Sequence, residues 1–334
     1  MKAALLTSYG EPLSVQEVDT PRIGPGEVLV KVKACGVCYT DVKGWKGERK
    51  STLPFILGHE ISGAVAEAGK DVGTVGVGDP VVVYYYATDG TCDRCTTGVE
   101  NLCRSIQLRF GGYAEYVSVP ALNCVRLQMG MSFEDAAFLT DAGLTSFHAI
   151  TDRANVRMGE VAMLQGMGGL ALAGVQILKL VGAKVIAVSR TPAKLDLARS
   201  LGADLTIDST TQDVAEEAMI YTGNTGVDHV FDYVGSPQTM SVDLKCLRPG
   251  GKLVPLGSTG QGFPPEMQGA ITGNLLSLVG SRGGTRKNLR DLVKLLSEGR
   301  IRSIVTQSFG LQEASQALKS LSEGRIVGRA VVRP

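Results

Sequence analysis

The chain has 334 residues, of which 44% are hydrophobic and 20% are charged, the proportions of an ordinary globular protein. This length suggests about two domains. Lys and Arg number 34 against 33 for Asp and Glu, so the bulk charge excludes a strongly basic nucleic-acid-binding protein. No apolar run reaches the roughly 18 residues of a membrane-spanning helix, and Gly10 interrupts the apolar start of the chain. We therefore expect a cytoplasmic protein without a membrane partner.

Residues 1–142 are dominated by short segments in which apolar and polar residues alternate. The predicted strands are 27–32, 61–66, 80–86 and 111–119, with glycines between them. Short strands at this spacing are typical of a small β-barrel or sandwich.

From residue 143 the pattern changes to strands that alternate with helices. The predicted strands are 161–164, 184–188, 230–233 and 252–256, and the predicted helices are 170–181 and 192–201. Strand–helix alternation with short links predicts a doubly wound parallel sheet, hence an α/β fold, over residues 143–284. The remaining segment, 285–334, has a predicted helix at 288–298 and a last strand at 327–332.

A glycine-rich turn joins the first strand of this α/β block to its first helix. It has the G-x-G-x-x-A pattern of dinucleotide-binding folds, and its candidate cofactor residues are Gly166, Gly168, Gly169 and Ala171. The first glycine allows the tight turn, the second lets the backbone approach a pyrophosphate, and Ala171 lets the helix pack closely on the strand. Strand, turn and helix in this order predict a nicotinamide dinucleotide site rather than a turn that binds nothing.

The end of the second strand of the block bears on the choice of cofactor. An acidic residue usually stands there to bind the ribose hydroxyls of NAD, but this chain has Ser189 and Arg190, and no acid before Asp196. A guanidinium without a carboxylate suits a 2′-phosphate, and Lys194 adds a second positive charge. The residues favour NADP(H); the alternative is that Arg190 is a solvated surface residue and NAD is used without the acid.

Three cysteines and an aspartate cluster on a loop, and they are predicted to bind one structural zinc ion. They are Asp89, Cys92, Cys95 and Cys103. Thiolates at this spacing suit a tetrahedral zinc ion, and four protein ligands leave no open position for a substrate. The alternative is three free thiols beside an aspartate.

A second set of chemically capable residues is dispersed along the chain. It comprises Cys38, Thr40, Asp41, His59, Glu60 and Asp141. Spacing alone does not show which of these side chains meet.

Several motifs in order make the chain similar to the zinc-dependent medium-chain dehydrogenase/reductase family of the alcohol-dehydrogenase type. They are GVCYTD at 36–41, GHE at 58–60, the loop cysteines, GGYAEY at 111–116, the glycine turn and GRAVV at 328–332. The resemblance spans essentially the whole chain. It implies a GroES-like β-barrel catalytic domain over 1–142, a Rossmann domain over 143–284, and a return of residues 285–334 to the catalytic domain.

The resemblance also implies roles for individual residues. A catalytic zinc ion would be held by Cys38, His59 and Asp141, with Glu60 as an occasional ligand. Asp41 would orient His59, and Thr40 would pass the substrate proton. Arg329 would contact the cofactor pyrophosphate and Thr145 the nicotinamide. Where several family members end the proton relay with a histidine, this chain has Lys43, and lysine is a poor proton acceptor near neutral pH.

These observations predict an enzyme with two zinc ions that interconverts a small alcohol and an aldehyde or ketone with NADP(H). One alternative is a C=C reductase of the same family, acting for instance on enoyl thioesters. A further alternative is a non-catalytic NADP(H)-binding protein, but none of the implied zinc ligands is missing. The family resemblance implies a homodimer or homotetramer.

Overall fold

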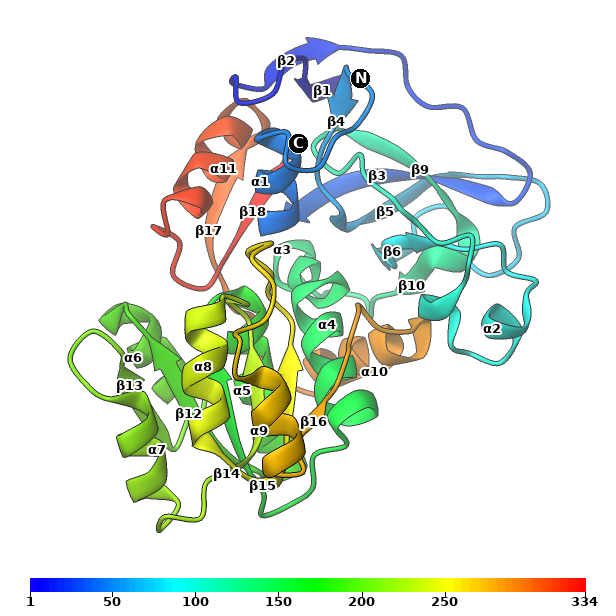
Figure 1. The fold of residues 1–334 in the computed structure, drawn as a ribbon. Helices are drawn as coiled ribbons and strands as arrows, with labels where there is room; N and C mark the ends of the chain where they lie inside the picture. The colour runs from blue at the N-terminus through cyan, green and yellow to red at the C-terminus, as the bar shows by residue number, and fades with distance from the viewer. The chain divides into compact units, whose positions relative to one another are not determined.

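A computed structural model describes all residues, 1–334, and divides the chain into two compact units (Figure 1). One unit comprises Met1–Asp141 and Thr285–Pro334, and the other is Ala142–Gly284. The predicted boundaries were 142/143 and 284/285, so the first of the two observed boundaries lies one residue earlier in the chain. None of the helices is both long and apolar enough to cross a membrane.

The first unit is built mainly from β-strands. Its largest sheet has the order β10-β6-β5-β3-β18-β17, with β9 also paired to β3, and two small sheets have the orders β2-β1-β4 and β7-β8. The strands are β1 (Lys2–Leu6), β2 (Ser14–Glu17), β3 (Glu27–Gly36), β4 (Phe55–Ile56), β5 (Glu60–Ala68), β6 (Pro80–Val83), β7 (Tyr86–Ala87), β8 (Gln107–Leu108), β9 (Tyr116–Pro120), β10 (Cys124–Arg126), β17 (Val305–Gly310) and β18 (Arg329–Arg333). The helices are α1 (Tyr39–Trp45), α2 (Asp93–Thr96), α3 (Phe133–Ala137), α10 (Arg286–Ser297) and α11 (Ala314–Ser322).

The end of the chain belongs to the sheet that its beginning forms. Strand β18 pairs antiparallel with β3, with Val331 opposite Gly36 and Val332 opposite Cys35, and Figure 1 shows the red strand beside the blue one. The apolar residues of both strands are buried in the same core. Burial of apolar surface from both ends of the chain therefore holds the C-terminal segment in the first unit.

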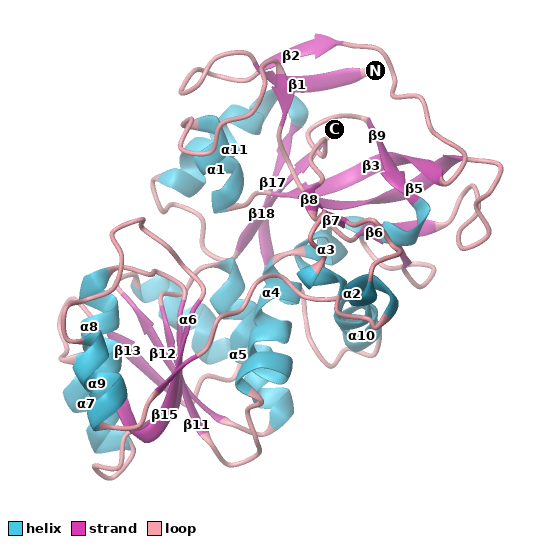
Figure 2. Cartoon of the chain, turned by 45° about the vertical axis from the view of Figure 1, so that its right-hand side comes forward, coloured by secondary structure: helices cyan, strands magenta, loops and turns pink.

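The second unit is a six-stranded parallel sheet with helices on both faces (Figure 2). Its strand order is β13-β12-β11-β14-β15-β16, the doubly wound order in which the direction of winding reverses between β11 and β14. The strands are β11 (Val161–Gln165), β12 (Lys184–Ser189), β13 (Leu205–Asp208), β14 (Val227–Asp232), β15 (Leu247–Pro255) and β16 (Ser277–Leu278). The helices are α4 (Ala142–His148), α5 (Gly169–Val181), α6 (Pro192–Ser200), α7 (Val214–Tyr221), α8 (Pro237–Cys246) and α9 (Met267–Gly273).

Two predicted strands of the first unit were wrong in extent. The segment 80–86 is not one strand, because β6 ends at Val83 and Tyr86 starts β7 in a different sheet. The segment 111–119 enters a strand only at Tyr116; before it, Ala114 forms an isolated bridge with Ala3. In both segments the alternation continues across a point where the chain changes its pairing partner, which a local pattern does not record.

Asp243 of helix α8 and Asp232 at the end of strand β14 form a buried carboxyl pair in the second unit. Asp243 is fully buried, and neither of its carboxyl oxygens has a hydrogen-bond partner. Burial, and then the negative charge of Asp232 at the end of β14, raise the pKa of Asp243 well above its ordinary value. Asp232 accepts hydrogen bonds from the N–H groups of Val234 and Gly235, so the negative charge of the pair is better stabilised there. Asp243 is therefore the protonated member.

We expect the substitution Asp243→Asn to raise the melting temperature at neutral and alkaline pH. The amide keeps the shape of the carboxyl group and cannot ionise. Because the folded-state pKa is raised, the contribution of Asp243 to stability is complete below its ordinary pKa of about 4 and is lost as the pH rises through the raised value. The difference in melting temperature between the variant and the parent should thus grow as the pH rises above the ordinary carboxyl pKa of about 4 and through the raised pKa of Asp243. Asp196→Asn, at an exposed position, is the control, and a pH-independent difference for Asp243→Asn would contradict the assignment.

Candidate metal and cofactor sites

Cys38, His59 and Asp141 meet in the first unit. Cys38 Sγ lies 3.2 Å from Asp141 Oδ2, and His59 Nε2 lies 3.5 Å from the same oxygen. One ligand atom from each residue lies within 4.8 Å of the other two, and all three residues are buried. The structure thus brings together the three side chains that spacing alone could not pair.

Asp41 fixes the orientation of the imidazole. Its Oδ1 lies 3.1 Å from His59 Nδ1 and accepts the backbone N–H of Gly58, while its Oδ2 accepts the N–H of Cys38. The contact with Cys38 is half of a capping box, which starts helix α1 at this point. With Nδ1 directed at Asp41, Nε2 is left to face Cys38 and Asp141, the arrangement that metal-bound histidines usually have.

Backbone conformation and close packing both require a glycine at position 58, immediately before His59. The φ of Gly58 is +89°, in the left-handed region, and a Cβ at this position would lie 2.6 Å from the ring of Tyr113. Only glycine meets both requirements without displacing the neighbouring chain. The turn at Gly58 therefore positions His59 at the start of β5.

The donor set fits a zinc ion. Tetrahedral ligation by thiolate, imidazole and carboxylate separates ligand atoms by roughly 3.3–3.8 Å, close to the two separations given above. Burial lowers the pKa of His59, but the negative charge of Asp41 and the contacts with Asp141 and Cys38 outweigh burial and raise it. Buried acidic groups around one imidazole attract positive charge, and a divalent cation supplies it.

Glu60 and Arg329 meet each other beside this set. Arg329 Nε donates to Glu60 Oε2 at 2.9 Å, its Nη2 pairs with Glu60 Oε1, and both side chains are buried. Arg329 Nη2 also lies 4.0 Å from Asp141 Oδ2. Both carboxylate oxygens of Glu60 are therefore engaged, and a role for Glu60 as a metal ligand requires that this ion pair opens.

Thr40 and Lys43 lie on one face of helix α1. They are three residues apart, and their side chains are half-buried. The backbone N–H of Thr40 points at Cys38 Sγ, at 3.5 Å. The side chains of Thr40 and Lys43 are thus about one helical turn apart.

The second donor set lies on the loop that includes helix α2. Asp89, Cys92, Cys95 and Cys103 place one ligand atom each within 4.8 Å of the others. Asp89 Oδ1 accepts the N–H groups of Thr91 and Cys92, both at 2.9 Å, so its other oxygen is free to face Cys103 Sγ at 3.1 Å. These backbone hydrogen bonds lower the pKa of Asp89, which keeps it ionised. Three sulfurs and one carboxylate fit a closed tetrahedral zinc site.

This loop is anchored by an ion pair to a distant helix. Glu100 is buried and accepts the backbone N–H of Arg286, whose Nε lies 3.2 Å from the same carboxylate oxygen. The guanidinium of Arg286 also lies over the ring of Tyr84. The loop is therefore packed on α10 of the same unit, and its folding is linked to that of the unit.

The variant Cys95→Ser is expected to lower the melting temperature by several degrees with a smaller effect on kcat. Serine is a poor zinc ligand, and binding of a structural zinc ion contributes directly to the free energy of folding. Thermal unfolding and zinc content of the variant measure this directly. Cys246→Ser, a buried cysteine in helix α8 outside both donor sets, is the matched control. A Cys95→Ser protein that keeps its metal content and melting temperature would rule out the structural ion.

The glycine-rich turn lies between β11 and α5 in the second unit. Gly166 has a φ of +88°, and a Cβ there would lie 2.6 Å from Val234. Gly168 is the N-cap of α5, and a Cβ there would meet no atom within 4 Å, which leaves room for a phosphate against the backbone. Gly169 and Ala171 are buried in the first turn of α5. Gly174, which the glycine pattern does not include, is also tightly packed: a Cβ there would lie 2.8 Å from the Tyr233 hydroxyl and 3.0 Å from Leu164 of β11.

Ser189, Arg190 and Lys194 gather at the end of β12. Arg190 is exposed, and burial together with the positive charge of Arg190 lowers the pKa of Lys194. Ser189 Oγ accepts the N–H of Thr191 at 3.1 Å. Thr191 is the N-cap residue of α6, but its hydroxyl makes no capping bond, and Pro192 begins the helix.

An acid near this strand end was missed by the sequence reading. Asp208 ends the neighbouring strand β13, directly opposite Ser189. Its Oδ1 is engaged by the backbone N–H and the hydroxyl of Thr210. Adjacent parallel strands bring this carboxylate beside Ser189, although the two residues are distant in the sequence. Thr145, the predicted nicotinamide contact, is buried in helix α4 of the same unit.

Two aromatic rings flank His59. The ring of Tyr85 lies 5.6 Å from the imidazole and that of Phe110 lies 5.4 Å from it, both edge-on. No motif in the sequence indicated Phe110. The antiparallel pairing of β7 with β8 brings the two segments together. The imidazole is thus flanked by two aromatic rings.

Comparison with known proteins agrees with this geometry. Two family models match, the alcohol dehydrogenase GroES-like domain over residues 24–129 and the zinc-binding dehydrogenase over residues 169–298. An alcohol dehydrogenase of Geobacillus stearothermophilus is 36% identical over all of this chain and 99% of its own length. A D-arabinose 1-dehydrogenase (NADP(+)) of Saccharolobus solfataricus is 34% identical over all of this chain and 97% of its own. The crystal structure of an NAD-dependent alcohol dehydrogenase superposes with a TM-score of 0.95 at 32% identity over the full length of both chains. The chain is therefore an enzyme of alcohol and carbonyl oxidoreduction and belongs to the zinc-dependent medium-chain alcohol dehydrogenase family.

Proposed function

We propose that this protein is a zinc-dependent, NADP(H)-preferring dehydrogenase that interconverts an alcohol and an aldehyde or ketone. The observation that supports this most is the convergence of Cys38, His59 and Asp141 on one point, with the imidazole held by Asp41. Three protein ligands leave the fourth position of a tetrahedral ion open, as catalytic zinc sites require.

The chemistry divides between the ion, the cofactor and the side chains. A bound zinc ion supplies Lewis acidity toward the alcohol or carbonyl oxygen, and the nicotinamide carries the hydride. In the proposed reaction the Thr40 hydroxyl accepts the substrate proton and passes it along the face of α1 on which Lys43 lies. Tyr85 and Phe110 exclude water beside His59.

We propose a second, structural zinc ion held by Asp89, Cys92, Cys95 and Cys103. All four positions of a tetrahedral ion would be filled, and the buried pair Glu100–Arg286 ties the loop to α10. This ion would stabilise the fold without touching substrate.

The proposed cofactor site begins at the turn from Gly166 to Ala171, where the N-terminus of α5 favours the pyrophosphate. Ser189, Arg190 and Lys194 would receive a 2′-phosphate. Thr145 would contact the nicotinamide. Arg329 would contact the pyrophosphate while it holds Glu60. The named relatives include an NADP(+)-dependent enzyme and an NAD-dependent one. We propose that the residues at the end of β12 determine which of the two cofactors this protein prefers.

One assay tests the reaction and the metal content together. Purified protein is supplied with NADPH and panels of aldehydes, ketones and activated alkenes, and zinc is measured in the same sample. We expect carbonyl reduction with about two zinc ions per chain. Reduction of activated alkenes alone would instead favour a C=C reductase. Binding of NADPH without turnover of any panel would refute catalysis of this kind.

A further inference from the structure

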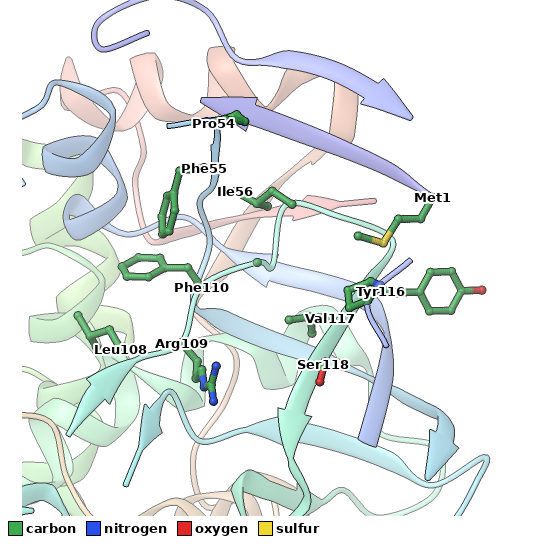
Figure 3. Close-up of a pocket in the computed structure, with 12 residues that line it drawn as sticks. Met1, Pro54, Phe55, Ile56, Leu108, Arg109, Phe110, Tyr116, Val117 and Ser118 are labelled. Atoms are coloured by element: carbon green, nitrogen blue, oxygen red, sulfur yellow. The ribbon is translucent and has the colours of Figure 1, made fainter. Parts of the chain in front are cut away.

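A pocket of about 430 Å³ opens on the first unit, beside strand β9 and the loop that follows β8 (Figure 3). This volume lies in the range of small-molecule binding sites, about 300–1,000 Å³. Its walls are mainly apolar, and the side chains that form them include Met1, Phe55, Ile56, Leu108, Phe110 and Val117. No acidic residue lines it. This lining fits an apolar molecule that is either neutral or negatively charged.

Arg109 is the one charged side chain among the residues that line the pocket. Its Nε is buried without a hydrogen-bond partner, and no carboxylate forms an ion pair with the guanidinium. An unpaired buried donor costs free energy, and a guanidinium presents a planar fork that matches a carboxylate. The backbone N–H of Arg109 donates to the carbonyl of Tyr85 at 2.8 Å, so the base of this side chain is fixed in place. The pocket thus combines an apolar wall with a positioned cation that has no partner.

Phe110 connects this pocket with the candidate metal site. Its ring lines the pocket, packs edge-on against Phe55 at 5.2 Å, and lies 5.4 Å from the imidazole of His59. Tyr85, the residue that holds the Arg109 backbone, is the other ring beside His59. Phe110 therefore contacts both the pocket and the imidazole of the candidate metal site.

We propose that this pocket binds the distal, carboxylate-bearing end of the enzyme's substrate, with Arg109 as the residue that selects it. The substrate class is then an aldehyde, ketone or alcohol with an apolar chain that ends in a carboxylate. This inference rests on the proposed function, because the reacting end of such a molecule would lie at Cys38, His59 and Asp141. Phe110 is the wall along which the apolar chain passes.

Kinetics with a matched pair of substrates test the selection. Suberic semialdehyde and octanal have the same chain and differ only in a terminal carboxylate or methyl group. In the parent protein, kcat/KM should be higher for the semialdehyde; in Arg109→Gln it should fall at least about tenfold for the semialdehyde, mainly through KM, and stay within about twofold for octanal. Arg109→Lys should recover part of the loss. Arg290→Gln, an exposed arginine of α10, removes the same charge elsewhere and should change neither substrate. Equal effects of Arg109→Gln on both aldehydes would overturn the proposal.

Direct binding separates this proposal from the proposed reaction. Calorimetry with octanoate, and with octanamide as its neutral counterpart, requires no turnover. Octanoate should bind the parent protein, compete with the semialdehyde, and bind at least about tenfold more weakly to Arg109→Gln. Octanoate binding that depends on Arg109 in a protein without any carbonyl activity would refute the proposed function and keep the carboxylate site. Binding without competition would assign the pocket to a separate ligand and overturn its role in substrate selection.

Discussion

Replacement of Cys38 by serine is expected to reduce kcat at least about a hundredfold while the protein stays folded. Lewis-acid stabilisation by a catalytic metal ion is worth several kcal/mol, and each 1.36 kcal/mol is a factor of ten in rate. Cys38 Sγ lies 3.2 Å from Asp141, so the substitution removes the thiolate from the centre of the ligand set. Loss of this zinc ligand should therefore remove the Lewis-acid contribution to the rate.

We expect the fold to be retained, because serine can replace Cys38 as the N-cap of helix α1. Cys38 is the N-cap of α1, and its sulfur accepts the N–H of Thr40. Serine is among the best N-cap residues, so its hydroxyl can accept the same bond. Helix α1 and the position of Asp41 should thus be retained.

Three measurements on one preparation decide the outcome: kcat, zinc content and melting temperature. Cys38→Ser should lose activity and about one zinc ion per chain with a small change in melting temperature. Cys124→Ser, at a cysteine of β10 outside both donor sets, should change none of the three. A Cys38→Ser enzyme with normal turnover would show that this donor set is not the catalytic centre.

Hydrophobic patterning predicted the fold class because β3 exposes Lys31 and Lys33 between buried residues, whereas β11 and β12 are buried almost throughout. The alternation at 27–32 and the apolar runs at 161–164 and 184–188 became β3, β11 and β12. Strand ends were less predictable. Strand β3 continues to Gly36 because pairing with β18 and β5 adds backbone hydrogen bonds beyond the alternating segment. Such pairing depends on a segment near the other end of the chain.

The two donor sets differ in how far local sequence could predict them. Asp89 and the three cysteines lie on one loop, so their spacing alone indicated a metal site. Cys38 and Asp141 are 103 residues apart, and only packing of the β-rich unit brings them together. The ion pair of Glu60 with Arg329 and the acid Asp208 beside Ser189 arise from strand pairing in the same way. Long-range contacts of this kind have no signature in a single sequence.

The groups at the end of β12 are better suited to bind the 2′-phosphate of NADP than the ribose hydroxyl of NAD. Arg190 and Lys194 bring two positive charges together without an acidic partner, and Pro192 begins α6 beside them. A helix N-terminus adds positive partial charge. The nearest acid, Asp208, has one oxygen engaged by Thr210. Charge-assisted hydrogen bonds to a 2′-phosphate are worth about 1.5–3 kcal/mol each, and 1.4 kcal/mol is a factor of ten in affinity.

We therefore expect kcat/KM for NADP⁺ to exceed that for NAD⁺ by at least about tenfold, and the double variant Ser189→Asp/Arg190→Ala to reverse the order. An aspartate at 189 can still accept the N–H of Thr191, as Ser189 Oγ does, so the turn should persist while a carboxylate becomes available to the ribose hydroxyls. Arg199→Ala is the control, since this exposed arginine of α6 is bonded to Asp196 and Thr206 rather than left for a ligand. Steady-state kinetics with both cofactors at a fixed alcohol concentration measure the preference. A parent enzyme that prefers NAD⁺ would show that Asp208, and not Arg190, governs the site, because its carboxylate would then bind the ribose and repel the phosphate.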